Sequence, residues 1–470
     1  MSNSVESSRF SHWQVNCHSA LLTDLYELTM AAGYHAHQIE CRATFELFIR
    51  RLPAQRSFLL ACGLEATLDY LEQFHFSGEE VDYLRGLPAF QTVPATFFDY
   101  LRTMRFAGDV WAVPEGTVVF GEEPIIQVTA PLAEAQIVET YLLSTINFET
   151  LIATKAARVY HAAGGKGVLE FGTRRAQGPE AGFRAARAAY VGGCEGTSNV
   201  LAGFYYGIPV YGTAAHSWTQ AFPTERESFE ALLDTFPETA ILLIDTYDPL
   251  AGAEIAGRLG RPVPGVRLDS GDLFEQSLLV RAILDRHGLA DTKIIASGDL
   301  NEYKVEELVS RGAAIDLYGV GTELSTSRDL PALSVVYKLV ETKQGERKEY
   351  KTKFSEQKAY LPGRKQVFRY FRDGRYDHDL ICRANELHPE AKGLLELFMK
   401  NGRRVEGREP ASAVRERAIE NLKQLPQEYQ ALQNAPRYPV EKSEAIEKLL
   451  EEVRERHFGA AEDFLPGKEV

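Results

Sequence analysis

The chain has 470 residues, of which 44% are hydrophobic and 25% are charged. These proportions are typical of a globular protein and exclude a disordered chain, which could not bury enough apolar surface to fold. The 52 basic and 66 acidic residues give a net charge of −14. This charge argues against non-specific nucleic-acid binding, which needs Lys and Arg to neutralise phosphates, but it is compatible with an anionic small substrate held in a local basic pocket.

The sequence also argues against a membrane or disulfide-stabilised protein. No apolar run approaches the roughly 20 residues that a membrane helix needs, and the first residues, MSNSVESSRFSHWQVN, lack the pattern of a signal peptide. The five cysteines are scattered and contain no CxxC spacing, so they predict neither a disulfide framework nor a zinc knuckle. We therefore expect a reduced, cytoplasmic protein without a dedicated metal site.

The first 163 residues pass through polar, helical and strand-like patterns. Apolar residues at helical spacing, preceded by Thr23 and Asp24 as capping residues, predict one helix early in the chain. Val-rich stretches broken by glycine and proline predict short strands. In chain order these patterns predict a loose arm over 1–20, a helix over 21–34, a strand over 43–49, short strands within 107–130 and a long helix over 132–163.

The middle of the chain repeats a short β-type run, a polar or glycine-containing turn and a helical stretch. Four turn residues, Asp245, Asp269, Ser297 and Thr322, are 24, 28 and 25 residues apart, which is one βα unit per step. Such repeats predict a parallel sheet, either a barrel or an open doubly wound sheet, with a site at the carboxyl ends of the strands. The predicted strands cover 167–171, 208–211, 241–244, 266–268, 294–296 and 315–318, and the predicted helices cover 180–190, 251–259, 273–286 and 305–311.

Beyond residue 333 this βα rhythm stops. Residues 335–340 and 367–371 predict strands, and the Lys/Glu-rich segment between them predicts a solvated hairpin. Residues 411–457 predict charged helices interrupted by prolines, and we recognise no chemistry in them.

The turns after the predicted strands carry residues suited to binding an anion. The tripeptide SGD occurs at 270–272 and again at 297–299, and GVGT spans 319–322. Glycine lets the backbone approach a ligand closely, and successive N–H groups at a helix start bind anions, so two such loops on neighbouring units would hold one phosphate. The chain has neither a Walker A sequence nor a GxGxxG that opens a helix, which argues against a P-loop nucleotide site and an NAD redox cofactor.

Basic side chains and one histidine fall in the same turns. Arg174, Arg175 and Arg267 favour an anionic substrate because a guanidinium group binds carboxylate or phosphate in a bidentate manner; the alternative is structural ion pairs with nearby carboxylates. His216, in GTAAHSWTQ, suits general acid–base work or phosphoryl acceptance, although a structural histidine fits the motif equally well. The absence of HxxxH, HExxH and GxSxG argues against zinc and serine hydrolases.

Seven ordered motifs between residues 21 and 397 resemble those of the nicotinate phosphoribosyltransferase family. They are TDLYELTMAAGY (23–34), EFGTRRAQGPEAG (170–182), GTSNVLAG (196–203), GTAAHS (212–217), GVRLDSGDL (265–273), ASGDLNEYK (296–304) and YGVGT (318–322). Their common order makes the resemblance far more specific than any single motif.

The resemblance implies an α/β type II phosphoribosyltransferase, with an irregular βα barrel and a smaller α/β domain formed from N-terminal and C-terminal segments. It also implies a homodimer with the active site at the subunit interface. On this basis we expect an N-terminal arm (1–20), a small α/β domain (21–132 and 333–410), an α/β barrel phosphoribosyltransferase domain (133–332) and a C-terminal helical segment (411–470).

The reaction implied by the resemblance joins nicotinate to phosphoribosyl pyrophosphate, giving nicotinate mononucleotide and pyrophosphate in NAD salvage. ATP would be a co-substrate that phosphorylates His216, which makes the expected enzyme an ATP-dependent ligase. Mg²⁺ would bind mostly through substrate phosphates and water, with Asp269, Asp272 and Asp299 as possible ligands.

The resemblance also assigns roles to individual residues. Tyr26, reaching from the partner subunit, and Phe171 would sandwich the pyridine ring, while His216, Arg267 and Asp269 would form the catalytic group. The implied nicotinate-binding residues are Tyr26, Phe171, Arg174, Thr213 and Arg267. The implied phosphoribosyl pyrophosphate-binding residues are Asp269, Ser297, Gly298, Asp299, Gly319, Gly321 and Thr322.

Several alternatives compete with this interpretation. Nicotinamide phosphoribosyltransferase has an aspartate in its motif GTDTVAG where this chain has Ser198; a carboxylate there would repel nicotinate, so Ser198 favours the acid. A phosphate-binding aldolase or isomerase barrel would explain the glycine loops but not TDLYELTM or the His216 motif. A non-catalytic binding protein is disfavoured by the intact His216, Arg267 and Asp269, and quinolinate phosphoribosyltransferase by its shorter chain and its lack of an ATP-linked histidine.

Overall fold

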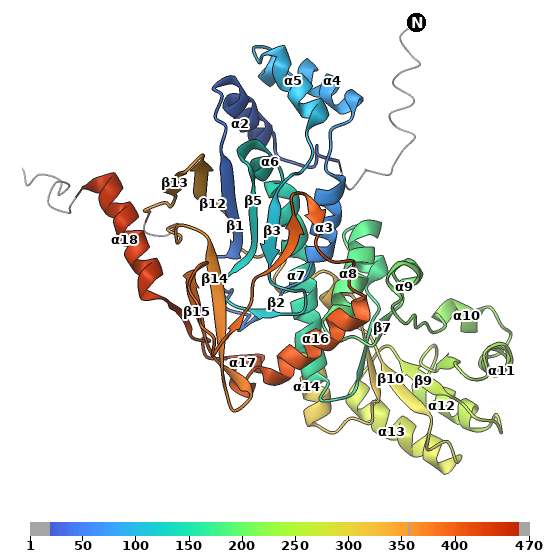
Figure 1. Cartoon of the computed structure of the whole chain (residues 1–470). Coiled ribbons are helices and arrows are strands. Elements are labelled where there is room, and N and C mark those ends of the chain that lie inside the picture. Colours follow the sequence, from blue (N-terminus) through green and yellow to red (C-terminus); the bar gives the residue numbers. More distant parts are fainter. Residues whose placement is uncertain (1–18, 356–357, 460–470) are drawn as a thin grey trace, which may run out of the picture.

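The computed structural model describes residues 19–355 and 358–459 (Figure 1). The predicted arm over 1–20 lies almost entirely outside these residues, as does the end of the predicted C-terminal segment. Within them the chain forms sheets of seven, six, four and two strands with helices around them, so the predicted α/β class is confirmed. Every described helix is too short or too polar to cross a bilayer.

The largest sheet combines strands from both ends of the chain. Its order is β13-β12-β1-β5-β3-β17-β18, with antiparallel neighbours. In β1, seven of eight residues are buried, which explains a nearly continuous apolar run instead of alternation. The predicted hairpin after residue 340 is confirmed as β12 and β13. The strands are β1 (Arg42–Ile49), β3 (Asp109–Ala112), β5 (Pro124–Pro131), β12 (Val335–Gln344), β13 (Arg347–Tyr350), β17 (Glu396–Lys400) and β18 (Arg403–Arg404), and a separate pair joins β2 (Leu59–Leu60) to β4 (Val118–Val119).

Short helices surround this sheet, most of them at one end of it (Figure 1). The predicted helix over 21–34 begins at Leu25, with Asp24 at the N-cap position, while the Thr23 hydroxyl donates to the Ile137 carbonyl oxygen at 2.8 Å. Another helix begins with a capping box between Ser77 and Glu80. The elements are α2 (Leu25–Ala36), α3 (Leu64–Gln73), α4 (Gly78–Gly86), η1 (Pro88–Phe90) and α5 (Ala95–Thr103).

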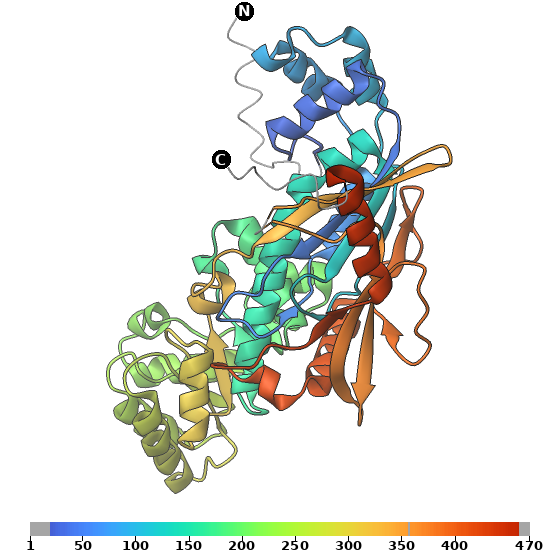
Figure 2. The same cartoon turned by 90° about the vertical axis from the view of Figure 1, so that its left-hand side faces the viewer.

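The predicted long helix over 132–163 is two helices, α6 (Leu132–Ile137) and α7 (Glu139–Ala162), which meet at Val138. Sixteen of the 24 residues of α7 are buried. Its first half, including Ile146, joins the core beside the antiparallel sheet, and its second half, including Val159, joins the core of the parallel sheet. In Figure 2, α7 is the long teal helix between these two parts of the molecule.

The middle of the chain forms a six-stranded parallel sheet with the order β7-β6-β11-β10-β9-β8. Because the first strand, β6, pairs with the last, β11, the strands follow one another around a circle as in a barrel. The circle continues from β7 to Val210, which bridges Thr197, but no strand pairing among the described residues joins Val210 to β8. The strands are β6 (Gly167–Glu170), β7 (Gly196–Thr197), β8 (Ile241–Leu243), β9 (Gly265–Leu268), β10 (Lys293–Ala296) and β11 (Leu317–Val320).

Two predicted strands of this region differ from the structure. The strand predicted over 208–211 is wrong: only the bridge at Val210 forms, because Pro209 has no N–H group to extend a ladder. The last strand, β11, begins two residues later than predicted. The helical elements are η2 (Thr173–Arg175), α8 (Pro179–Val191), α9 (Val200–Tyr206), α10 (His216–Gln220), α11 (Glu225–Thr235), α12 (Pro249–Gly257), α13 (Leu273–Arg286), α14 (Glu302–Ser310) and α15 (Thr322–Ser325).

A four-stranded sheet and three helices complete the chain. The sheet order is β16-β14-β15-β19. The first of the three helices packs elsewhere, since its residues Val414 and Ala418 belong to the core of the parallel sheet. The region predicted as charged helices therefore also contributes a strand, β19. The elements are β14 (Lys365–Arg372), β15 (Arg375–Arg383), β16 (Lys392–Gly393), β19 (Val440–Lys442), α16 (Ala411–Gln424), α17 (Gln427–Gln430) and α18 (Glu444–Phe458).

Candidate active site

The carboxyl ends of β6, β11, β10 and β9 lie side by side because these strands are parallel neighbours. Phe171 follows β6, and its backbone N–H donates to the Val320 carbonyl oxygen at 2.9 Å. A Cβ atom at Gly319 would come within 2.6 Å of the Phe171 ring and 3.3 Å of the Ser297 Cβ atom. The ring therefore uses the space that glycine leaves at the tip of β11, next to the tip of β10.

Arg267, near the end of β9, joins the neighbouring strand ends. Its Nε donates to Ser297 Oγ at 2.9 Å, and its Nη2 donates to Asp269 Oδ1 at 2.9 Å. Its Nη1 donates to Thr213 Oγ1 and, at 3.3 Å, to the Ala214 carbonyl oxygen. One guanidinium group thus connects β9, β10 and the segment that precedes α10, and this fixes its orientation.

Asp269 is an ionised carboxylate between this arginine and His216. Burial would raise the pKa of Asp269, but the hydroxyl of Ser297 and the guanidinium of Arg267 outweigh burial and hold that pKa below its usual value. The backbone N–H of Asp269 donates to Asp245 Oδ2 at 2.7 Å, and its Oδ2 lies 4.0 Å from His216 Nε2. The carboxylate is therefore available to interact with positive charge at neutral pH.

The turn after β10 has the backbone conformation that its glycine predicts. Gly298 has φ +96° and Asp299 has φ +46°. A side chain at Gly298 would overlap the carbonyl oxygen of Asp269, so only glycine fits there. Lys304 Nζ donates to the Asp299 carbonyl oxygen at 2.8 Å. This turn can direct successive N–H groups toward an anion.

His216 is the first residue of α10, beside the open part of the strand circle. Its Nδ1 lies 3.2 Å from Thr246 Oγ1, just beyond the end of β8. Its side chain is 42% exposed, so its Nε2 can meet a reactant from solvent while Thr246 fixes the ring. The histidine is thus in the same group as Asp269 and Arg267.

The other predicted residues differ in position. Gly321 and Thr322 follow β11. Gly321 lies close to Gly172, because a Cβ atom added at Gly172 would be 2.8 Å from the Gly321 carbonyl oxygen. Arg174 is exposed in η2, two residues beyond Gly172. Tyr26 is 48% exposed on α2, at the end of the molecule opposite to β9 and β10 (Figure 1). A single chain therefore does not bring Tyr26 to the strand ends.

Two residues of this site were not predicted as site residues. Asp245 follows β8, and its Oδ2 accepts from the backbone N–H of Asp269 and, at 3.1 Å, from Ser270 Oγ. Its Oδ1 is buried and has no hydrogen-bond partner among the described residues. Thr246 orients His216. The turn DTYD, at the same spacing as the other strand ends, was the signal that could have identified both residues.

Glu170 is a third residue that sequence reasoning did not select. It is buried at the end of β6, and its carboxylate accepts from the backbone N–H of Gly172 and from Thr197 Oγ1. These bonds tie the turn that carries Phe171 to β7. Only its place directly before Phe171 could have indicated this positioning role.

The arrangement can bind an anion beside a flat ring. An oriented arginine, a glycine turn, an ionised carboxylate, an accessible histidine and an aromatic ring share one set of strand ends. Asp272 is already used as the N-cap of α13, since its Oδ1 accepts from the backbone N–H groups of Phe274 and Glu275 at 3.0 and 3.1 Å. Fold and site together define an α/β protein equipped to hold an anionic ligand at the tips of a parallel sheet.

Three family models match this chain. They are the nicotinate phosphoribosyltransferase N-terminal domain at residues 21–147, the nicotinate phosphoribosyltransferase family at 167–358 and the nicotinate phosphoribosyltransferase C-terminal domain at 386–450. The chain is 44% identical to the nicotinate phosphoribosyltransferase pncB2 of Mycobacterium tuberculosis, over 96% of both chains. It is 39% identical to the Bacillus subtilis nicotinate phosphoribosyltransferase, over 90% of this chain and 93% of that one.

A solved structure agrees with these matches. The crystal structure of human nicotinic acid phosphoribosyltransferase aligns with a TM-score of 0.80 and 30% identity, over 92% of this chain and 99% of the human one. The chain belongs to the nicotinate phosphoribosyltransferase family. The predicted resemblance is therefore confirmed.

Proposed function

We propose that the chain transfers the phosphoribosyl group of phosphoribosyl pyrophosphate to nicotinate at the strand ends described above, with ATP coupled to the reaction through His216. The observation that carries this proposal is the unbroken set of contacts from Phe171 through Gly319 and Ser297 to Arg267 and Asp269. It supports a site in which an aromatic ring, a guanidinium group and a carboxylate face one bound molecule.

The chemistry of phosphoribosyl transfer suits these residues. When the bond between the anomeric carbon and pyrophosphate breaks, positive charge develops on the ribose and negative charge on the leaving group. The ionised Asp269 is suited to the ribose hydroxyls, and the turn at Gly298 and Asp299 to the 5′-phosphate. The Phe171 ring would hold the pyridine by offset stacking while Arg267 orients the bound acid.

His216 is the residue that we assign to ATP coupling. Its exposed Nε2 is free to accept a phosphoryl group, and Thr246 at Nδ1 holds the ring in place. A phosphoryl group on Nε2 would lie near the ionised Asp269, so its repulsion is suited to changing the geometry of the site between binding and release. Mg²⁺ would be held mostly by substrate phosphates, with Asp269 and Asp299 as possible protein ligands, since Asp272 is used as the N-cap of α13.

A homodimer would bring Tyr26 to this site. Two helices expose apolar side chains: α2, with Tyr26 at 48% exposed, and α9, with Phe204 at 81%. Such patches mark interaction surfaces, and α9 follows β7 next to the Phe171 turn. In a two-fold dimer, α2 of each subunit can cover α9 of the other, so the same contact forms at both sites. The exposed apolar residues are Leu22, Leu25, Tyr26 and Met30 at α2, and Val200, Leu201, Phe204 and Tyr205 on α9.

We further propose a cytoplasmic location. The cysteines among the described residues, Cys41, Cys62, Cys194 and Cys382, are all free thiols, which suits a reducing compartment.

The direct test is an assay of the purified protein with phosphoribosyl pyrophosphate, nicotinate and Mg²⁺, with and without ATP. We expect nicotinate mononucleotide and pyrophosphate in equal amounts, faster when ATP is present. His216→Ala should keep the ATP-independent reaction and lose the acceleration by ATP. Failure of the wild-type protein to release pyrophosphate would contradict the proposed reaction, and full acceleration by ATP in His216→Ala would contradict the role of His216.

Nicotinamide is the alternative acceptor, and Ser198 bears on it. The backbone N–H of Ser198 donates to the Glu170 carbonyl oxygen at 2.9 Å, which places Ser198 directly beside the Phe171 turn. A carboxylate at this position would repel nicotinate, so serine supports the acid as substrate. Turnover of nicotinate and nicotinamide in the same assay distinguishes the two, and a preference for nicotinamide would contradict this choice.

A further inference from the structure

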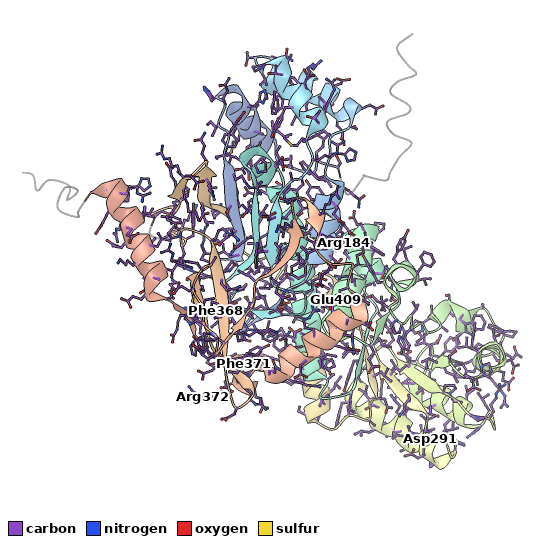
Figure 3. The ribbon with its side chains drawn as sticks, in the orientation of Figure 1. Arg184, Asp291, Phe368, Phe371, Arg372 and Glu409 are labelled. Carbon is purple, nitrogen blue, oxygen red and sulfur yellow. The ribbon has the colours of Figure 1, made fainter. Side chains whose placement is uncertain are left out.

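A second group of potential ligands lies in the four-stranded sheet, away from the strand ends of the parallel sheet. Cys382 Sγ, a carboxylate oxygen of Glu386 and a ring nitrogen of His388 all lie within 4.8 Å of one another. In Figure 3, Phe368 marks this sheet and Asp291 marks the distant parallel-sheet part. We propose that Cys382, Glu386 and His388 bind one zinc ion, which has no part in the reaction proposed above.

The separation of the sulfur and nitrogen atoms fits tetrahedral zinc. Cys382 Sγ lies 3.4 Å from His388 Nε2. With Zn–S at about 2.3 Å and Zn–N at about 2.0 Å, tetrahedral ligands are separated by about 3.5 Å. The two atoms thus need almost no movement to bind the same ion, and a water molecule can complete the coordination.

The imidazole of His388 is held as it is in known metal sites. Its Nδ1 lies 2.8 Å from the Tyr370 hydroxyl, which itself donates to Glu390 Oε1 at 3.1 Å. Because the Tyr370 proton is used in this way, Nδ1 carries the ring proton and donates, and the lone pair of Nε2 points toward Cys382 Sγ. The Phe368 ring packs against the imidazole with centroids 4.7 Å apart. Metal-binding histidines typically have such a partner on the other ring nitrogen.

Glu386 supplies the third ligand from a fixed position. Its Oε1 accepts from the Arg383 backbone N–H at 2.6 Å and from Ser443 Oγ at 2.8 Å. Both of these bonds use Oε1, so Oε2 is the atom suited to a metal. Ser443 is the N-cap of α18, so a bound ion would link the end of β15 to the start of α18.

The chemical types of the three ligands indicate which metal would bind. Thiolate, imidazole and carboxylate together favour zinc over Mg²⁺ or Ca²⁺, which prefer oxygen ligands. On binding, the Cys382 thiol releases one proton to solvent and a Zn–S bond forms, without oxidation or reduction. The prediction of no metal site rested on the absence of CxxC, and a Cys-x₃-Glu-x-His spacing does not present that signal.

A second cluster, of one cysteine and two glutamates, does not compete for the ion. Cys62, Glu115 and Glu149 also lie within 4.8 Å of one another. However, the buried guanidinium group of Arg187 occupies this cluster, with ion pairs of 2.5 Å to Glu115 and 3.5 Å to Glu149. Its charge already compensates the carboxylates, so a second cation has no place there.

Cobalt is the most direct probe of this site, because a Co²⁺–thiolate bond absorbs in the near ultraviolet. The full-length protein is treated with a chelator and titrated with Co²⁺ and then with Zn²⁺. We expect one Co²⁺ per chain, a sulfur-to-cobalt charge-transfer band, its loss when one equivalent of Zn²⁺ is added, and release of one proton per ion. Elemental analysis of the zinc-loaded protein should give one zinc per chain.

Matched variants assign the band to this site. Cys382→Ser and His388→Gln should lose it, and Tyr370→Phe should weaken binding about ten- to a hundredfold. Cys41→Ser and Cys62→Ala are the controls and should keep it. Circular dichroism verifies the fold of each variant. Absence of the band in the folded wild-type protein would show that Cys382 and His388 form only a hydrogen bond, and persistence of the band in Cys382→Ser would place the metal elsewhere; either result overturns the proposal.

Discussion

Arg267 is the residue on which the geometry of the strand ends depends. Its guanidinium group makes four hydrogen bonds, to a serine, an aspartate, a threonine and a backbone carbonyl from three segments of the chain. Lysine has three donors on a flexible stem and cannot reproduce this planar fork.

Replacing Arg267 by lysine should therefore lower kcat/KM for nicotinate about ten- to a hundredfold, since each lost charge-assisted hydrogen bond corresponds to about 1.5–3 kcal/mol. Steady-state kinetics with both substrates measures the loss. Arg175→Lys is the matched control, because Arg175 is exposed in η2. Kinetics of Arg267→Lys within twofold of the wild type would contradict the central role of this side chain.

Gly319 offers a second test at the level of a single residue. An added methyl group would lie 2.6 Å from the Phe171 ring and displace it. We expect Gly319→Ala to raise KM for nicotinate about tenfold or more, with a smaller effect on KM for phosphoribosyl pyrophosphate. Gly86→Ala is the control, because its Cβ atom would meet nothing within 4 Å. An equal rise in both KM values would argue against stacking on Phe171.

At the scale of secondary structure elements, α2 combines an exposed face with a buried carboxyl group. Glu27 is fully buried beside Tyr26. Burial, together with Glu139 and Asp24, raises the pKa of Glu27 to about 8, although the hydroxyl of Thr140 opposes this change. Since the folded-state pKa is higher than the usual 4.5, the folded protein favours protonated Glu27. Its contribution to the free energy of unfolding is complete below pH 4.5 and decreases as the pH rises to about 8.

Glu27→Gln should remove this pH dependence. We expect the variant to unfold at a higher temperature than the wild type at about pH 8.5, and the difference to shrink toward about pH 5, where Glu27 is protonated and resembles glutamine. Thermal unfolding across this pH range measures the effect. Glu40→Gln, at an exposed position just beyond α2, is the control. A constant difference at all pH values would contradict the assignment.

Helix α7 carries a buried charge network that links separate parts of the chain. Lys155 Nζ lies 2.6 Å from Glu302 on α14 and 2.8 Å from Asp329, which also binds Arg56 at 2.8 Å. Lys155→Met would leave buried carboxylates without this partner. We expect it to lower the free energy of unfolding by about 3–5 kcal/mol, measured by urea denaturation. Lys448→Met, on the last helix α18, is the control; an equal effect of the two substitutions would contradict the importance of the network.

At the scale of the whole molecule, the separation of Tyr26 from Phe171 makes a prediction about assembly. Tyr26→Ala and Phe171→Ala should each be nearly inactive, because each removes one side of the proposed ring clamp. When the two variants are unfolded and refolded together, half of the dimers are mixed and each has one intact site, so about a quarter of wild-type activity should return. Recovery no higher than that of the separately refolded variants would contradict a site shared between subunits.

The apolar face of α9 can be tested in the same assembly. Phe204→Glu should shift the protein toward monomers in analytical ultracentrifugation and reduce activity, because Phe204 is 81% exposed in the single chain. Leu279 is also exposed (51%) but lies on α13, so Leu279→Glu is the matched control. Retention of the dimer by Phe204→Glu would exclude α9 as its contact.

Much of this organisation was predictable from local sequence patterns, and the exceptions have physical reasons. Glycine turns after apolar runs predicted the strand ends at Asp269 and Ser297, because parallel strands place such turns together. The lone bridge at Val210 could have been predicted, because Pro209 is visible in the sequence and its missing N–H argues against a strand over 208–211. The break at Val138 was not predictable, since it depends on tertiary packing. The bonds from Arg267 to Thr213, 54 residues away in the chain, likewise need the folded sheet.

The interruption of the strand circle between Val210 and β8 bears on motion during turnover. In a closed barrel each loop connects two strands that are fully paired with their neighbours. The segment that carries His216 instead follows a single β-bridge at Val210. Between Tyr211 and α10 this segment is held mainly by side chains, namely the bonds of Arg267 to Thr213 and Ala214 and the contact of His216 with Thr246. We therefore expect the segment that carries His216 to be displaced more easily than the six paired strands, which would let the histidine change position between steps of the proposed reaction without rearranging the sheet.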